Sequence, residues 1–289
     1  MADDRSPDFR IYDETMMTAR ADSLDSPHSP HSPQARFFAL IPCAGQGSRA
    51  GTPLAKQYQL VAGKALVLHT LAAFAAVNRL DKTLVVVAPG DLFFDQTTPD
   101  SAFEVADCGG ASRADSVFNG LQALRLAGAL DDDWVLVHDA ARCMISPAQI
   151  DRLIDACAGD AVGGLLALKL PDTLKREADG RVACTVARAD KWLAQTPQMF
   201  RLGALSEALH AAGDGITDES SAMEAMGLQP KLVAGSAENF KVTYAEDFRL
   251  AEAILLGRSG RSNKADKADK ADKADKADKA DNANKSTAP

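Results

Sequence analysis

Short apolar runs alternate with segments of helical periodicity between residues 37 and 256. A strand covered on both faces carries apolar side chains on both, so an uninterrupted apolar run predicts a buried strand. Such runs occupy residues 37–42, 83–88, 103–107, 134–138, 164–168 and 231–233. Apolar positions at helical spacing predict helices over residues 64–77, 116–126, 147–157, 217–226 and 245–256. The alternation predicts an α/β fold whose mostly parallel sheet carries helices on both faces.

The segment from residue 171 to about residue 195 breaks this alternation. Two β-like stretches, residues 173–176 and 182–188, flank the sequence Ala178-Asp179-Gly180. Asp-Gly between such stretches indicates a hairpin turn, and a lone two-stranded hairpin is only marginally stable in water. We therefore expect a projecting β-hairpin arm that packs against a second subunit in a homodimer. The alternative is a surface flap on a monomer.

The two ends of the chain differ in composition from its middle. Residues 1–35 contain seven acidic and three basic residues and a Ser-Pro-His-Ser-Pro-His-Ser-Pro run. Residues 264–281 repeat Lys-Ala-Asp six times. Neither composition offers enough apolar surface for a core. We expect disordered tails at residues 1–35 and 259–289 around one folded domain at residues 36–258.

Charge and cysteine content narrow the classes of function. A net charge of −8 and only 6% aromatic residues argue against a nucleic-acid partner, which favours basic surfaces and stacking platforms. No apolar run approaches the roughly 18 residues of a membrane span, and the acidic N-terminal segment lacks the apolar stretch of a secretory signal. Five cysteines without a CxxC pattern predict free thiols and a cytoplasmic protein.

The first predicted strand leads into a loop suited to phosphate. In an open α/β sheet, ligands bind beyond the carboxyl ends of the strands, where glycines let backbone N–H groups approach phosphate oxygens. Gly45-x-Gly47-x-x-Ala50 also fits a loose dinucleotide fingerprint. However, Gly-Thr-Pro follows instead of a helix, and the loop carries Arg49, with Lys56 seven residues later. Two added cations favour a nucleoside triphosphate over a pyrophosphate diester.

Two further elements complete a candidate nucleotide pocket. A second glycine loop, residues 109–116, follows the third predicted strand, although such a loop can also be a capped strand–helix turn. Asp139 ends another buried strand, where a carboxylate can hold Mg²⁺ that bridges phosphates, and Arg142 can bind a second anionic group. A simple Asp–Arg ion pair is the alternative. His138 alternates away from Asp139 along the strand and is interpreted as a core residue.

An ordered set of segments carries a family resemblance. The segments are residues 44–49, 53–58, 109–110, 113–117, 135–142, 172–175, 185–188, 196–200, 217–219 and 239–243. On these segments the middle of the chain resembles the 2-C-methyl-D-erythritol 4-phosphate cytidylyltransferases of the non-mevalonate isoprenoid pathway. The resemblance implies a Rossmann-like fold of the nucleotide-diphospho-sugar transferase type. It also implies transfer of CMP from CTP to 2-C-methyl-D-erythritol 4-phosphate, with release of pyrophosphate.

The resemblance also implies roles for individual residues. It places Arg49, Lys56 and Lys241 at the reacting α-phosphate. The residues implied in CTP binding are Ala44, Gly45, Gly47, Gly110 and Ser116. Asp139 is implied in holding Mg²⁺. The residues assigned to the methylerythritol phosphate site are Arg142, Thr173, Arg188, Thr196 and Thr217. Arg188 and Thr196 lie on or just after the hairpin, so the resemblance implies that they reach into the active site of a partner subunit.

The chain departs from the family pattern at Cys43, Ala111 and Cys143. Ala111 replaces a polar residue, and the affinity for CTP is the property that this change puts in question. Two other functions remain open: a nucleotidyltransferase for another sugar or polyol phosphate, and a non-catalytic nucleotide-binding domain. Retention of both Arg49 and Lys56 argues against the second. Fusions to a cyclodiphosphate synthase domain occur among relatives, and we expect none in this chain.

Overall fold

The computed structural model describes residues 35–45, 55–96, 102–212, 216–258 and 260. The expected tails fall almost wholly outside these residues, as do Gly47 and Arg49 of the first glycine loop, so those expectations stay predictions. Within the described part of the chain, no helix is both long and apolar enough to cross a membrane. All five cysteines are described, and all carry free thiols, as their spacing predicts.

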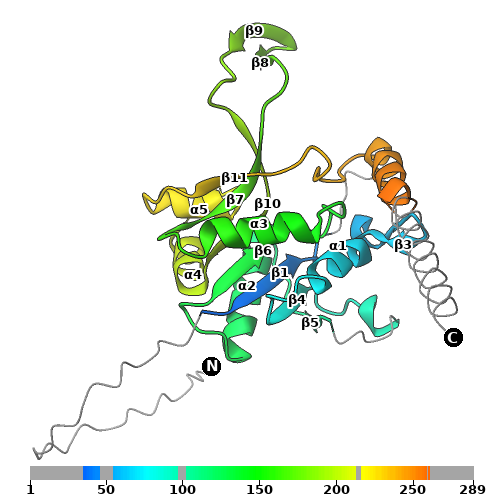
Figure 1. Cartoon of the computed structure of the whole chain (residues 1–289), viewed down its shortest axis with the longest axis vertical. Helices are drawn as coiled ribbons and strands as arrows, with labels where there is room; N and C mark the ends of the chain where they lie inside the picture. Colours follow the sequence, from blue (N-terminus) through cyan, green and yellow to red (C-terminus); the bar gives the residue numbers. More distant parts are fainter. Residues whose placement is uncertain (1–34, 46–54, 97–101, 213–215, 259, 261–289) are drawn as a thin grey trace, which may run out of the picture. The chain divides into compact units, whose positions relative to one another are not determined.

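Among the described residues, seven strands form the central sheet, in the spatial order β11-β7-β10-β6-β1-β4-β5 (Figure 1). They are β1 (Phe37–Pro42), β4 (Lys82–Val86), β5 (Glu104–Ala106), β6 (Trp134–Val137), β7 (Gly163–Lys169), β10 (Trp192–Arg201) and β11 (Lys231–Ala234). Neighbours are parallel except at β10, which runs antiparallel to both β6 and β7. The sheet is therefore mostly parallel, as predicted, and β1, β4 and β6 end at the same edge.

Helices cover both faces of the sheet because successive side chains of a strand point to opposite faces. On β1, Ala39 and Ile41 pack with α1 (Leu66–Ala75) and α3 (Pro147–Cys157). Phe38 and Leu40 pack on the opposite face. The helices on that face are α2 (Arg113–Leu126), α4 (Leu202–Ala211) and α5 (Glu219–Ala225). A third apolar cluster joins Ala251, in the helical residues 245–258, to Val242 and to the start of α1.

Local sequence signals account for most element ends. Helix α3 matches its prediction, with Pro147 in its first turn. Helix α2 begins three residues earlier than predicted because Ser112 caps it: the Ser112 side chain accepts a hydrogen bond from Asp115 N, and the Asp115 carboxylate accepts one from Ser112 N. Helix α1 begins two residues late, because residues 64–65 instead pair with residues 60–61. The short elements are η2 (Lys56–Tyr58), β2 (Leu60–Val61), β3 (Lys64–Ala65) and η3 (Phe94–Gln96).

The pattern of apolar positions did not predict β10 or α4. Strand β10 contains Gln-Thr-Pro-Gln at its centre, and proline is rare in a central strand because it cannot donate to the ladder. The structure accommodates Pro197 through an irregularity in the pairing with β7, where the register shifts between Ala194 and Gln198. This irregularity lies next to the candidate site and brings polar side chains into a central strand.

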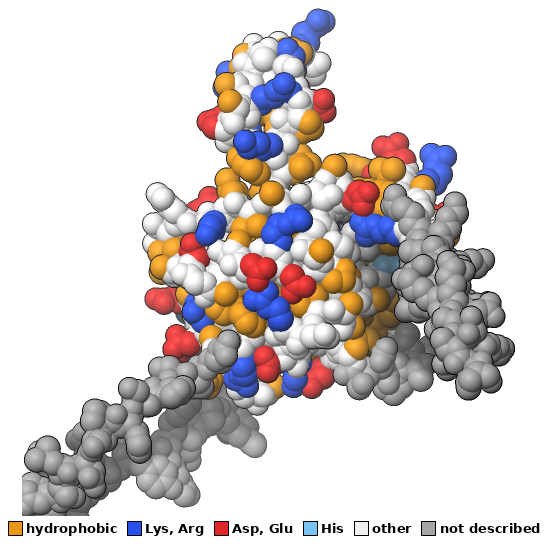
Figure 2. Space-filling view, viewed as in Figure 1, with side chains coloured by type: hydrophobic (Ala, Val, Ile, Leu, Met, Phe, Trp, Pro, Cys, Tyr) orange, Lys and Arg blue, Asp and Glu red, His pale blue; other side chains and the backbone are white. Residues whose placement is uncertain are grey.

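The predicted hairpin is present as a separate two-stranded sheet of β8 (Leu174–Ala178) and β9 (Arg181–Val186). Its turn has positive φ at Asp179 (51°) and Gly180 (73°), as the favoured two-residue hairpin turn requires. The hairpin stands apart from the central sheet, on extended chain that leaves β7 and returns to β10 (Figure 1). Figure 2 shows basic side chains at the end of the hairpin, and Val182 of β9 is 65% exposed.

Candidate functional site

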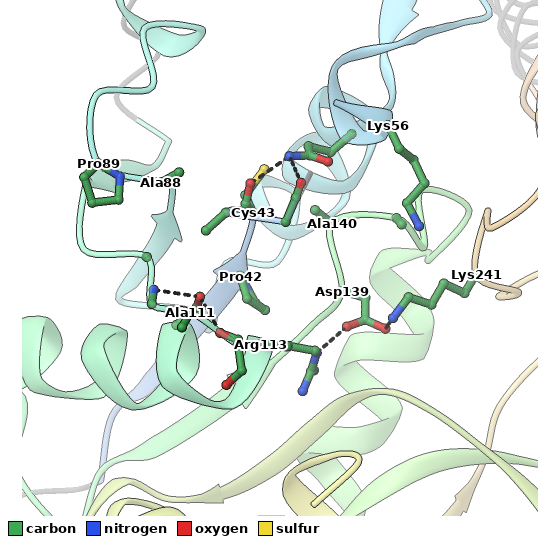
Figure 3. Close-up of a pocket in the computed structure, with 18 residues that line it drawn as sticks. Pro42, Cys43, Lys56, Ala88, Pro89, Ala111, Arg113, Asp139, Ala140 and Lys241 are labelled. Atoms are coloured by element: carbon green, nitrogen blue, oxygen red, sulfur yellow. Dashed lines mark hydrogen bonds and ion pairs between the residues drawn. The ribbon is translucent and has the colours of Figure 1, made fainter. Parts of the chain in front are cut away.

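A pocket of about 560 Å³ opens where β1, β4 and β6 end. This is the edge at which open α/β sheets bind ligands, and the volume lies in the usual range for a small-molecule site. The charged side chains among its described lining residues are Lys56, Arg113, Asp139 and Lys241 (Figure 3). Ala44, Gly45, Gly110 and Ser116 also line it. The structure thus brings together seven of the predicted site residues.

The two glycine loops pack closely against each other and against α2. A Cβ atom on Gly109 would lie 2.4 Å from Ala44 Cβ, and one on Gly110 would lie 2.3 Å from Asp115 Cβ. Both positions therefore require glycine. On the first loop, Gln57 Nε2 donates to the carbonyl oxygens of Cys43 and Gly45, each at 2.8 Å. The described part of this loop is held in place before any ligand arrives.

Ser116 shapes the second loop from within α2. Its hydroxyl accepts a hydrogen bond from Gly110 N at 3.1 Å and donates one to Ser112 O at 2.9 Å. The side chain is buried, although the residue reaches the pocket lining. In this structure, the Ser116 side chain therefore orients the backbone of Gly110, which lines the pocket together with Gly109 and Ala111.

Asp139 lies at the centre of a cluster of cations. Its Oδ1 atom accepts from Arg113 Nε at 2.8 Å, and its Oδ2 atom lies 2.9 Å from Lys241 Nζ and 3.5 Å from Arg142 Nε. Arg113 and Lys241 reach the carboxylate from opposite sides (Figure 3). Burial by itself would raise the pKa of Asp139, but Arg113, Lys241 and Arg142 together lower that pKa well below its ordinary value. The carboxylate is therefore ionised throughout the physiological range.

A buried hydroxyl fixes the backbone of Asp139. Thr196 Oγ1 accepts from Asp139 N at 3.0 Å and lies 3.0 Å from His138 Nδ1. His138 is wholly buried, which confirms its interpretation as a core residue, and burial lowers its pKa to about 3. The neutral ring accepts a hydrogen bond from the Thr196 hydroxyl at Nδ1, and its Nε2–H donates one to Arg142 O at 3.3 Å. These hydrogen bonds together fix the backbone that follows β6, from His138 to Arg142.

Lys241 is carried by a loop from the far end of the sequence. Arg142 Nη1 donates to Asn239 O at 2.7 Å, and Asn239 Nδ2 donates to Thr196 O at 2.8 Å. Val242 N donates to Ala141 O at 2.9 Å. These bonds tie the Lys241 loop to the chain that follows Asp139. Much of the hydrogen-bonding capacity of Arg142 is thus used inside the protein.

The remaining predicted substrate residues lie outside this pocket. Thr173 and Arg188 are exposed on the arm, where Arg188 donates to Pro171 O. Thr217 is exposed just before α5 and lines a small neighbouring cavity with Arg113 and Glu219. Thr196 is buried behind Asp139. In the described part of the chain, Thr173 and Arg188 lie away from the pocket, whereas Thr217 shares the small cavity with the pocket-lining Arg113 and Thr196 contacts the backbone of Asp139.

The donor set for a divalent cation is small. Among the described residues that line the pocket, Asp139 is the sole carboxylate. The described part of the chain holds no group of three or more His, Cys, Asp or Glu residues suited to a metal ion. Mg²⁺ usually takes one or two carboxylates and draws its other ligands from water and substrate phosphates. The site fits Mg²⁺ only in that form, with the ion shared between Asp139 and phosphate oxygens.

Comparison with known proteins decides the family. A sequence model described as 2-C-methyl-D-erythritol 4-phosphate cytidylyltransferase matches residues 37–257. The chain belongs to this cytidylyltransferase family. A relative of that name from Paraburkholderia phytofirmans is 57% identical over 229 residues, which cover 76% of this chain and 96% of the relative. The family resemblance and the enzyme class predicted from the motifs are therefore confirmed.

Other relatives agree. A bifunctional IspD/IspF enzyme from Albidiferax ferrireducens is 71% identical over 225 residues, which cover 78% of this chain and 54% of that enzyme. The chain thus spans about half the length of this bifunctional relative. A crystal structure of 4-diphosphocytidyl-2C-methyl-D-erythritol synthase matches with a TM-score of 0.69 and 39% identity over 76% of this chain and 99% of that one. A family member from Thermus thermophilus has a TM-score of 0.62 and 30% identity over 75% and 98%. The predicted fold class is confirmed.

The sequence reasoning missed two residues of the charged cluster, Arg113 and Glu219. Arg113 lies at the end of the second glycine loop, where α2 begins. Its position in the sequence does not distinguish it from any other residue in the first turn of a helix. Glu219 opens α5, and an acidic residue there is typical of a helix start. Their pairing joins residues 106 apart in sequence, so no local pattern in the sequence could reveal it.

Proposed function

We propose that this chain transfers CMP from CTP to 2-C-methyl-D-erythritol 4-phosphate, giving 4-diphosphocytidyl-2-C-methyl-D-erythritol and pyrophosphate. The observation that carries the proposal is the pocket of two glycine loops and the cationic cluster around Asp139, in a chain of this family. A phosphate oxygen of the methylerythritol substrate attacks the α-phosphorus. The bond to the β-phosphate oxygen breaks, and that oxygen leaves with the electron pair.

The residues suit this chemistry because both reactants are anions. A phosphate monoester is already nucleophilic near neutral pH, so the step needs positioning and stabilisation of developing charge rather than a general base. Lys56 and Lys241 are the described cations that we assign to the α-phosphate, with Arg49 outside the described residues. Backbone N–H groups near Gly45 and Gly110 are assigned to CTP.

We also propose Mg²⁺ as the cofactor, held by Asp139 together with phosphate oxygens. When bound, the ion would neutralise phosphate charge. The protein's own part is to keep the Asp139 carboxylate ionised and oriented, through Arg113 and the hydrogen bond that Thr196 accepts from Asp139 N. The five free thiols support a cytoplasmic location.

The proposed activity is tested by pyrophosphate release with CTP, UTP or ATP, each with and without 2-C-methyl-D-erythritol 4-phosphate. Release should require both CTP and the methylerythritol substrate. Equal turnover of another nucleotide, or of another polyol phosphate in place of the methylerythritol substrate, would favour a different nucleotidyltransferase. Binding of CTP without release under any condition would favour a nucleotide-binding domain.

We further propose that the arm reaches a second copy of the chain and completes its substrate site. The exposure of Thr173 and Arg188, away from the pocket of their own chain, supports this. Arg188 would then bind the phosphate of the substrate in the partner's site, since its planar guanidinium can make two charge-assisted hydrogen bonds.

Mixed dimers test the shared site. Arg188→Ala subunits are combined with Lys56→Ala subunits, and each variant alone should have strongly reduced activity as a homodimer. If the site is shared, one site of the heterodimer has both lesions and the other has none, so about half of the wild-type dimer's activity returns. If each site is built from one chain, both sites stay damaged and no activity returns. That second result would refute the shared site and leave the cytidylyltransferase proposal standing.

A further inference from the structure

A buried carboxylate faces the charged cluster from behind the pocket. Glu219, the first residue of α5, is 1% exposed and does not line the nucleotide pocket. Its two oxygens accept from Arg113 Nη1 at 2.7 Å and from Arg113 Nη2 at 3.1 Å. The third nitrogen of the same guanidinium, Nε, donates to Asp139. Arg113 is therefore a bridge between a carboxylate in the site and a carboxylate behind it.

The role of Glu219 goes beyond starting a helix. Asp218 already caps α5, because its carboxylate accepts from Ser221 N at 2.9 Å. An acidic residue in the first turn normally faces water, where the helix dipole stabilises it. Glu219 instead turns inward to α2 and loses its hydration, which is costly unless the charge is paired. A buried pair adds little stability over apolar packing, so its position next to the site needs another explanation.

The charges of the site supply that explanation. Arg113 lines the pocket, and an arriving triphosphate offers it strong alternative partners. If Asp139 were the only carboxylate bound to Arg113, the guanidinium could turn toward the phosphates and release Asp139. The bidentate contact with Glu219 opposes that movement, since an arginine fork held by two hydrogen bonds has a fixed plane.

On the basis of the proposed cytidylyl transfer, we infer that Glu219 is a positioning residue, which holds Arg113 against Asp139 while the nucleotide is bound. In this inference Glu219 acts through Arg113, which both of its carboxylate oxygens contact. Losing it would free Arg113 to bind the ground-state triphosphate and would remove a negative charge from the neighbourhood of the phosphates. Both effects leave CTP binding intact or stronger, whereas the arrangement of Asp139 and Lys241 for the reaction is lost.

The test is steady-state kinetics of pyrophosphate release by four proteins: wild type, Glu219→Gln, Arg113→Lys and the double variant. Glutamine keeps the size of Glu219 but not its charge. Lysine keeps the charge of Arg113 but cannot hold both carboxylates. Each single change should lower kcat by about 10-fold to 100-fold, the usual effect of removing a residue that orients a group in the site through a hydrogen bond. The KM for CTP should not rise, and the double variant should be no slower than Arg113→Lys, because both changes break one bridge.

Asp133→Asn is the matched control. Asp133 is a buried carboxylate in a two-point contact with Arg36, at the opposite end of β6 from Asp139. This variant should lose stability without a change in kcat. A Glu219→Gln enzyme with wild-type kcat, a loss only through a higher KM, or additive losses in the double variant would each overturn the inference. If Glu219→Gln does not fold, Arg113→Lys decides alone: wild-type kcat there overturns the inference. Wild-type turnover of CTP with the methylerythritol substrate in the same assay tests the proposed function separately.

Discussion

The cationic cluster makes one prediction that can be measured without substrate turnover. Asp139→Asn removes the carboxylate that Arg113, Arg142 and Lys241 share. Removing one partner of a buried ion pair costs about 3–5 kcal/mol. Arg113 keeps Glu219, and Lys241 is 36% exposed, so water screens part of the loss. We therefore expect the free energy of unfolding to fall by about 3 kcal/mol, the lower end of that range.

An anionic ligand should restore part of this loss. We propose urea unfolding in EDTA, with and without inorganic triphosphate, for wild type, Asp139→Asn and Asp133→Asn. Triphosphate returns negative charge to the unpaired cations, so it should stabilise Asp139→Asn by at least ~1 kcal/mol more than it stabilises wild type. The Asp133→Asn control should be destabilised and should gain from triphosphate only as much as wild type.

EDTA removes divalent cations, so the comparison does not depend on whether Asp139 also binds Mg²⁺. A stability loss below about 1 kcal/mol would show that the three cations do not depend on the carboxylate. Equal stabilisation of wild type and Asp139→Asn by triphosphate would show that the phosphates bind elsewhere. Either result would refute the electrostatic reasoning for this site.

Three other changes test the site and the fold. Lys56→Ala should lower kcat by about 10²–10³-fold, the usual effect of removing one hydrogen-bond donor that stabilises developing charge. The melting temperature should stay unchanged, and wild-type turnover would refute the role assigned to Lys56. The pKa of His138 is about 3 in the folded protein and about 6.5 in the unfolded chain. Between these two pH values, the unfolded chain therefore binds a proton that the native chain does not. Stability should fall by ~2 kcal/mol between pH 6.5 and pH 5, and urea titrations should show a correspondingly smaller fall for His138→Asn. A chain without residues 1–33 and 262–289 should keep wild-type melting and turnover, because their composition offers no core.

The sequence predicted those parts of the fold that depend on short-range patterns. Strand β1 and helix α3 appear with their predicted ends, and the Asp179-Gly180 turn adopts the predicted geometry. Local chemistry is decisive in each case: a continuous apolar run, a proline in the first helical turn, or a glycine at positive φ. The pocket lining at the glycine loops was predictable for the same reason, since the ends of neighbouring parallel strands must meet.

The parts that escaped prediction depend on contacts between distant segments. Arg113 and Glu219 are 106 residues apart, and Arg142 and Asn239 are 97 apart. Thr196 carried a substrate role by resemblance, yet in the structure its hydroxyl lies between Asp139 N and His138. Only the antiparallel insertion of β10 beside β6 creates that contact, and the proline in β10 hid the strand from the pattern of apolar positions.

The electrostatics of Asp139 bear on which group can accept or carry a proton in the proposed cytidylyl transfer, with Asp139 in its proposed place at the site. A general base must gain a proton near the working pH, and the surrounding cations hold the pKa of Asp139 well below its ordinary value despite its burial. Asp139 therefore remains a fixed negative charge throughout the reaction. A phosphate monoester loses its second proton with a pKa of about 6, so the substrate arrives with its nucleophile already deprotonated. The protein needs no base, and its ionised carboxylate instead keeps Arg113 and Lys241 in place before two anions enter. Because folding has already fixed these charges, little reorganisation is left for the reaction step, which is how such a site lowers a barrier between like charges.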